Sequence, residues 1–191
     1  MNRVLALLLT WLLSAACHAA EADSLKAGVF SPPHPAPEFT LGGSNGAPLS
    51  LSQYRGKVVA LAFGFSHCAE VCPVTLATLA QARKALGPQG RDMQVIYVTV
   101  DPERDDAARM KSWLAAFDPT FVGGTGSKQA LDAVDKLYGV SATKMTTTSG
   151  YSFGHSSSVY LIDRDGRLRA MMPYGHGAED YAHDVRLLMR K

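Results

Sequence analysis

Two uninterrupted apolar runs constrain the fold of this chain more than any other feature of its sequence. KVVALAFGF covers residues 57–65 and QVIYVTV covers residues 94–100, and neither alternates polar and apolar residues as a half-exposed strand does. Such runs are typical of strands that are covered on both faces. Between them, VTLATLAQARKALG has the apolar spacing of an amphipathic helix. This order predicts a sheet with helices on both faces.

The rest of the chain continues the alternation of strands and helices. At 191 residues, 47% of them hydrophobic, one domain is enough to bury a core. The predicted fold is therefore α/β, with a central mixed sheet flanked by helices and an N-terminal hairpin. The further elements expected are a hairpin of Phe39–Leu41 with Leu49–Leu51, a helix from Asp101 to Phe117, a strand at Phe121–Val122, a helix at Ser127–Tyr138, a hairpin around Asp165-Gly166, and a last helix over residues 178–191.

The first residues, MNRVLALLLTWLLSAACHAA, have the layout of a secretory signal peptide. We expect a signal over residues 1–19 that is cleaved after Ala19, or a lipoprotein signal that ends before Cys17. Retention as an anchor is the third alternative, although the apolar run is well short of the ~20 residues that span a bilayer. All three export the protein. A periplasmic location, or a membrane anchor that faces the periplasm, is therefore expected.

The segment that follows the signal is rich in proline, with four prolines between Ser31 and Glu38. This composition predicts an extended linker over residues 20–38, so we expect the folded domain to cover residues 39–191. The formal net charge is +2, and no block of like charge forms a nucleic-acid footprint. We expect no nucleic-acid partner, and membrane contact only through a retained anchor or lipid.

The segment FSHCAEVCPVT places Cys68 and Cys72 directly after the first buried run, with three residues between them. Pro73 suits the first position of a helix, so we expect Cys72 at or next to the helix cap and Cys68 in the preceding turn. The positive end of the helix dipole would favour the thiolate form of both sulfurs. A structural disulfide is the simplest alternative in an oxidising compartment, but it would close too small a loop to stabilise the fold much.

Two thiolates at this spacing can bind one metal ion. Soft sulfur ligands favour Cu(I), and a histidine would complete a trigonal site that also takes Cu(II) with an added oxygen donor. The spacing alone leaves Zn(II) open. The candidate third ligand is His155, which precedes an apolar strand where thioredoxin-like oxidoreductases have a cis-proline facing their cysteines. We expect His67 to point away from Cys68, and His34 and His183 to face solvent.

Three segments in the right order resemble the Sco/SenC family, copper-binding proteins of thioredoxin fold that assist the assembly of cytochrome c oxidase. These segments are GKVVALAFGFSHCAEVCP, VTVDPERD and GHSSSVYLIDRDG. The resemblance covers most of residues 40–175 and implies that Cys68, Cys72 and His155 are copper ligands. The chain departs from the family's usual pattern in having Ala69-Glu70 after the first cysteine, where proline and then an acid are usual. It also has Gly154 in place of the common aspartate before the histidine.

The resemblance implies a copper metallochaperone, not an enzyme in the turnover sense. It would deliver copper to the dinuclear copper site of cytochrome c oxidase, or keep the cysteines of that site reduced. Its partners would be the copper-bearing oxidase subunit and another periplasmic copper chaperone. The alternatives are a thiol:disulfide oxidoreductase with a redox-active Cys68–Cys72 disulfide, and a thiol peroxidase suggested by VCPVT. The absence of prolines between Pro119 and Pro173 argues against the oxidoreductase, which would need a cis-proline to receive its substrate strand.

Several other conspicuous residues have simpler interpretations. The acidic segment DPERD, residues 101–105, is expected to be a capped helix start and not a second metal site. Met171-Met172, Phe63, Phe65 and Tyr97 are expected to pack in the core.

Overall fold

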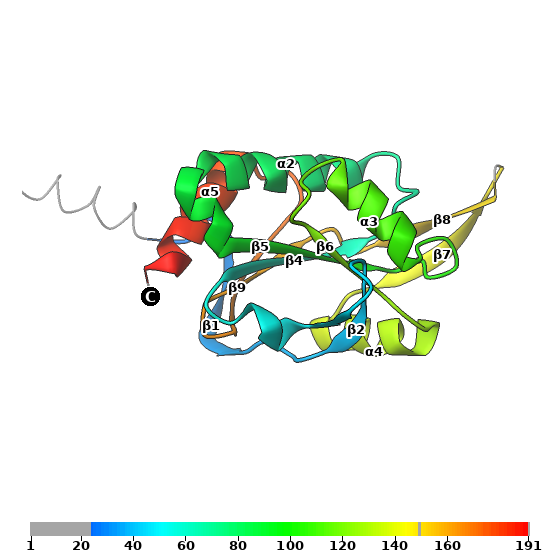
Figure 1. Cartoon of the computed structure of the whole chain (residues 1–191), viewed down its shortest axis with the longest axis horizontal. Helices are drawn as coiled ribbons and strands as arrows, with labels where there is room; N and C mark the ends of the chain where they lie inside the picture. Colours follow the sequence, from blue (N-terminus) through cyan, green and yellow to red (C-terminus); the bar gives the residue numbers. More distant parts are fainter. Residues whose placement is uncertain (1–23, 149, 191) are drawn as a thin grey trace, which may run out of the picture.

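The computed structural model describes residues 24–148 and 150–190, and a mixed sheet runs through this part of the chain (Figure 1). Within the described residues the sheet has eight strands in the order β1-β10-β9-β4-β5-β6-β2-β3. β4, β5 and β6 are parallel, and the other neighbouring pairs are antiparallel. The strands are β1 (Gly28–Pro35), β2 (Thr40–Gly43), β3 (Pro48–Ser50), β4 (Val58–Gly64), β5 (Met93–Thr99), β6 (Val122–Thr125), β9 (Val159–Ile162) and β10 (Arg167–Met172).

The two apolar runs form the centre of this sheet. Every residue of β4 and β5 is buried, and the two strands pair in parallel. Burial follows from cover on both faces: α2 (Val71–Ala85), α3 (Ala107–Ala115) and α5 (Ala178–Met189) lie on one face, and α4 (Lys128–Tyr138) lies on the other (Figure 1). The 3-10 helices η1 (Leu51–Tyr54) and η2 (Gly87–Asp92) connect elements. The predicted α/β fold, with its flanking helices and the N-terminal hairpin β2–β3, is confirmed.

The N-terminal boundary of the domain was predicted wrongly. Residues 28–35 lie within the expected linker, yet they form β1, which pairs with β10 at the edge of the sheet. An edge strand tolerates prolines because one side of it needs no hydrogen-bond donors. The preceding backbone is held in place as well, since the amides of Lys26 and Ala27 donate to the buried carboxylate of Asp184 in α5 at 2.8 and 2.9 Å.

The helix expected from Asp101 begins later than predicted. The carbonyl of Asp101 accepts from the amide of Asp105 at 3.0 Å and closes a separate turn. α3 then starts after Asp106, whose carboxylate accepts from the Arg109 amide at 2.7 Å and so caps the helix. The predicted cap is therefore wrong, and the DPERD segment is free to take part in contacts described below.

One further hairpin was not predicted. β7 (Ala142–Thr147) and β8 (Gly150–His155) pair with each other and not with the main sheet. The hairpin projects beyond the end of the sheet (Figure 1). Its last residue is His155, so the hairpin fixes where the candidate ligand lies.

The predicted signal peptide, residues 1–19 with Cys17, lies outside the described residues. Across residues 24–148 and 150–190, none of the helices combines the length and the apolar character needed to span a bilayer.

Candidate metal centre

Cys68 and Cys72 lie where β4 gives way to α2. The helix begins at Val71, so Cys72 is its second residue. Pro73 was predicted at the first position of the helix but is its third residue. The Cys72 amide lies in the first turn of the helix and therefore has no acceptor inside the helix. It points at the Cys68 sulfur, and the nitrogen and the sulfur are 3.4 Å apart. The amide of Cys68 in turn donates to the Phe65 carbonyl at 3.3 Å. The start of the helix therefore holds both sulfurs in place.

His155 approaches the cysteines from the end of β8. Its Nε2 atom is 3.4 Å from the Cys72 sulfur, and its Nδ1 atom is 2.8 Å from the carbonyl oxygen of Ser156. A carbonyl oxygen only accepts, so Nδ1 carries the hydrogen. Burial lowers the pKa of His155 and favours the neutral ring. The lone pair on Nε2 therefore faces the cysteines, as a metal ligand requires.

Aromatic packing orients the imidazole. The ring of Phe65 lies edge-on to His155, with centroids 5.8 Å apart, and edge-on to Phe153, with centroids 5.6 Å apart. Phe65 is buried, as predicted, but it also forms a wall of the candidate site.

The three donor atoms form one group. The sulfurs of Cys68 and Cys72 and a ring nitrogen of His155 all lie within 4.8 Å of one another. An ion bound at ~2.3 Å from sulfur and ~2.0 Å from nitrogen holds its donors at most ~4.6 Å apart, so small side-chain rotations are enough to bind one ion. In the part of the chain that the structure describes, no other group of three or more His, Cys, Asp or Glu side chains is arranged in this way. The donor set of two sulfurs and one nitrogen fits copper in its soft, reduced form.

The expected thiolate form is corrected for one of the two cysteines. Cys72 is only 2% exposed, and burial raises the pKa of its thiol to about 12, although the neighbouring Tyr97 hydroxyl acts in the opposite direction. The helix dipole does not overcome this desolvation. In the metal-free protein Cys72 is a neutral thiol, and a metal ion must displace its proton.

Alkylation provides a direct test of this asymmetry. We expect iodoacetamide at pH 8 to modify the partly exposed Cys68 at least ~100-fold faster than the buried Cys72, because only the thiolate reacts. Peptide mass spectrometry over a time course measures both rates. In urea-unfolded protein the two rates should converge. Equal rates in the folded protein would contradict the burial of Cys72.

The DPERD segment anchors the β7–β8 hairpin. The Tyr151 hydroxyl of β8 donates to Asp101 at 3.0 Å and to Glu103 at 3.1 Å. The guanidinium of Arg104 and the ammonium of Lys144 lie 3.8 and 3.7 Å from the centroid of the Tyr151 ring. These contacts hold the strand that carries His155. This role could not be predicted from the sequence, because the partners are about fifty residues apart.

A second network fixes the turn before Cys68. The carboxylate of Asp105 is fully buried and accepts from the amide and hydroxyl of Ser66 and from the hydroxyl of Thr99. Arg109 also donates to the Ser66 hydroxyl, at 2.9 Å. Asp105 therefore ties the turn after β4, which leads to Cys68, to the end of β5.

The other histidines lie apart from the donor group. The side chain of His67 is 42% exposed and lies against Ser66, so its predicted outward position is confirmed. His34 is exposed, as predicted. The prediction for His183 is wrong, because it is half-buried and its Nδ1 atom lies 2.9 Å from Asp184.

Gly154 is not required by the backbone or by close packing. A Cβ atom added there would meet only the side chain of Met145, at 3.4 Å and beyond. The chain could therefore carry a larger residue before His155.

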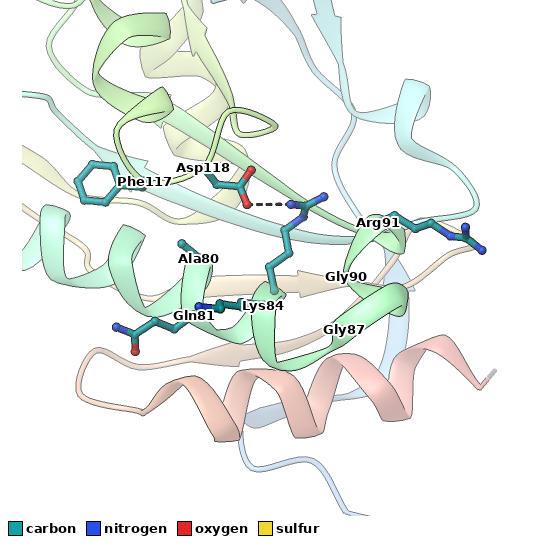
Figure 2. A pocket seen from close by; sticks show the side chains of 9 residues that line it. Ala80, Gln81, Lys84, Gly87, Gly90, Arg91, Phe117 and Asp118 are labelled. Carbon is teal, nitrogen blue, oxygen red and sulfur yellow. Dashed lines mark hydrogen bonds and ion pairs between the residues drawn. The ribbon is translucent and has the colours of Figure 1, made fainter.

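A pocket of about 540 Å³ lies between the end of α2 and the end of α3, lined by residues that include Gln81, Lys84 and Phe117 (Figure 2). Its Arg83 side chain is paired with Asp118 at 2.8 Å. None of the three donor residues lines this pocket, so it plays no part in the candidate site.

Comparison with known proteins agrees with this geometry. A model of the SCO1/SenC family matches residues 31–190, which include the larger part of β1 and all three donor residues. The chain belongs to this family. Among curated relatives, the mitochondrial SCO2 homologue of Mus musculus is 33% identical over 153 residues, 78% of this chain and 60% of the mouse protein. The chain spans between 58% and 66% of the length of the first three curated relatives that it matches.

Solved structures of Sco proteins share the fold. ScoI of Bradyrhizobium japonicum, determined with copper bound, is 33% identical, and the two structures match with a TM-score of 0.73. The match covers 79% of this chain and 97% of the ScoI chain. Apo Sco1 of Thermus thermophilus is 32% identical with a TM-score of 0.77 and covers 86% of this chain and 97% of its own. The Sco/SenC chain described here is thus thioredoxin-like, as predicted.

Proposed function

We propose that this Sco/SenC protein is a periplasmic copper chaperone that binds one Cu(I) ion through Cys68, Cys72 and His155. One observation carries the proposal: two sulfurs and an imidazole nitrogen converge within 4.8 Å at the start of a helix. The copper bound in the 33% identical ScoI supports the choice of metal. The family's connection with cytochrome c oxidase supports the copper-bearing subunit of that oxidase as the receiver, with another copper chaperone as the supplier.

The exposure of the ligands gives a direction for transfer. Cys72 is buried, whereas Cys68 and His155 are partly exposed. A thiolate of the receiving protein would therefore approach on the side of Cys68 and His155, and Cys72 would release the ion last. Burial of the inner sulfur keeps water away from the Cys72 thiolate until the receiver has docked.

A thiol reductase is the second candidate, favoured by the partly exposed Cys68 beside a buried free thiol. The two functions differ in what the metal-free, reduced protein does. A chaperone should reduce an unrelated disulfide substrate slowly, whereas a dedicated reductase should do so rapidly. Rapid reduction, together with normal oxidase assembly in a deletion strain under copper scarcity, would replace the chaperone proposal.

Copper titration with a competing Cu(I) chelator tests the site itself. The reduced protein should bind one equivalent of Cu(I), and His155→Ala should weaken binding at least tenfold, or ~1.4 kcal/mol, because two sulfurs still bind the ion. His67→Ala is the matched control, since His67 lies next to Cys68 but outside the donor group. Equal losses in the two histidine variants would refute His155 as a ligand.

A further inference from the structure

The buried hydroxyl of Tyr97 is unusual in having no hydrogen-bond partner. Tyr97 lies on β5, is 1% exposed, and its oxygen makes no hydrogen bond within the described residues. Its ring is held by edge-on packing against Trp113 of α3, with centroids 5.3 Å apart. An unpaired buried hydroxyl destabilises a folded protein, and phenylalanine would fill the same space without this cost. The hydroxyl therefore needs an explanation that core packing does not give.

Gly64 shows where this hydroxyl points. A Cβ atom added to Gly64 would lie 1.9 Å from the Tyr97 oxygen and 2.9 Å from the Cys72 sulfur. Gly64 is the last residue of the central strand β4 and does not have a positive φ angle, so its backbone does not require glycine. What requires glycine is the space, which the tyrosine oxygen and the cysteine sulfur share. The two atoms are thus neighbours above the end of β4.

We propose that Tyr97 is a positioning residue that donates a hydrogen bond to the Cys72 sulfur when this sulfur binds a metal ion. The inference rests on the proposed function and adds a residue to its site. The sulfur of a thiol is a weak hydrogen-bond acceptor. A metal-bound thiolate carries negative charge and is a much stronger acceptor in a buried setting. The hydroxyl that is unsatisfied in the free protein then becomes satisfied in the loaded protein.

This proposal predicts opposite effects on stability and on copper binding. Tyr97→Phe should leave the metal-free protein as stable as the wild type or more stable, because it removes an unpaired buried hydroxyl. The same variant should bind Cu(I) about tenfold more weakly, the scale of a hydrogen bond to a charged group. In the Cu(II) form, its sulfur-to-copper charge-transfer band should move to longer wavelength, because the sulfur lone pair is no longer stabilised.

Tyr160→Phe is the matched control. The Tyr160 hydroxyl is also buried, but it donates to the carbonyl of Tyr138 at 2.5 Å. Its loss should lower the unfolding midpoint and leave the copper affinity and the charge-transfer band unchanged.

The experiment combines thermal unfolding of the metal-free proteins, Cu(I) titration against a chelator, and absorption spectra of the Cu(II) forms. If the wild type binds Cu(I) but Tyr97→Phe binds it equally well with an unchanged band, the role of Tyr97 is refuted and the proposed function stands. A metal-free Tyr97→Phe protein less stable than the wild type would also refute it, in favour of a packing role. A wild type that binds no Cu(I) would overturn the proposed function instead, and this inference with it.

Discussion

A variant with both Cys68→Ser and Cys72→Ser is expected to lose Cu(I) binding completely. Hydroxyl oxygens are hard, neutral donors, and His155 alone cannot hold a soft ion against a chelator. The fold should remain, because serine is close to cysteine in size and the surrounding core is otherwise intact. Burial of a hydroxyl at position 72 should lower the free energy of unfolding by only ~1–3 kcal/mol.

Metal analysis after chelator competition, with circular dichroism as the test of folding, measures this outcome. Each single cysteine variant should also lose tight binding, since the remaining sulfur and imidazole make a two-ligand site. His67→Ser provides a folded variant that should still bind one equivalent, because His67 lies outside the donor group. Undiminished copper in the folded double variant would rule out the site.

The elements that were predicted correctly carry their signals in local sequence. β4 and β5 are continuous apolar runs, α4 has Ser127 as a cap that accepts from the Ala130 amide at 3.2 Å, and the β9–β10 hairpin has Asp165-Gly166 at its turn. The cysteine pair was recognisable from its spacing after a buried strand. These features depend on residues close together in the chain, which a sequence displays directly.

The features that were missed depend on contacts between distant segments. β1 is a strand only because β10 offers an edge, and the β7–β8 hairpin is held by Tyr151 reaching Asp101 fifty residues away. The helix dipole at Cys72 was visible in the sequence, but the burial that outweighs it was not. Tyr97 was rightly placed in the core, yet nothing local showed that its hydroxyl would lie beside the Cys72 sulfur.

Oxidation of the Cys68–Cys72 pair is expected to abolish tight Cu(I) binding. The two sulfurs lie within 4.8 Å of each other, so side-chain rotation can bring them to the ~2.05 Å of a disulfide bond. A disulfide removes both thiolate donors at once and leaves His155 alone. Copper loading and disulfide formation are therefore alternatives for the same pair of atoms.

By thermodynamic linkage, bound Cu(I) should in turn make the cysteine pair harder to oxidise. Cu(I) binds only the reduced form of the pair. Each tenfold increase in the free Cu(I) concentration above the Kd should therefore make the reduction potential of the pair ~30 mV more positive. Copper-loaded protein should then resist oxidants that convert the metal-free protein to the disulfide within the same time. Thiol titration and mass spectrometry of the two forms, with the chelator added back as a control, measure this protection. Equal oxidation rates with and without bound Cu(I), or tight Cu(I) binding by the disulfide form, would show that the cysteines do not hold the metal. The thiol reductase would then be the better interpretation of this cysteine pair.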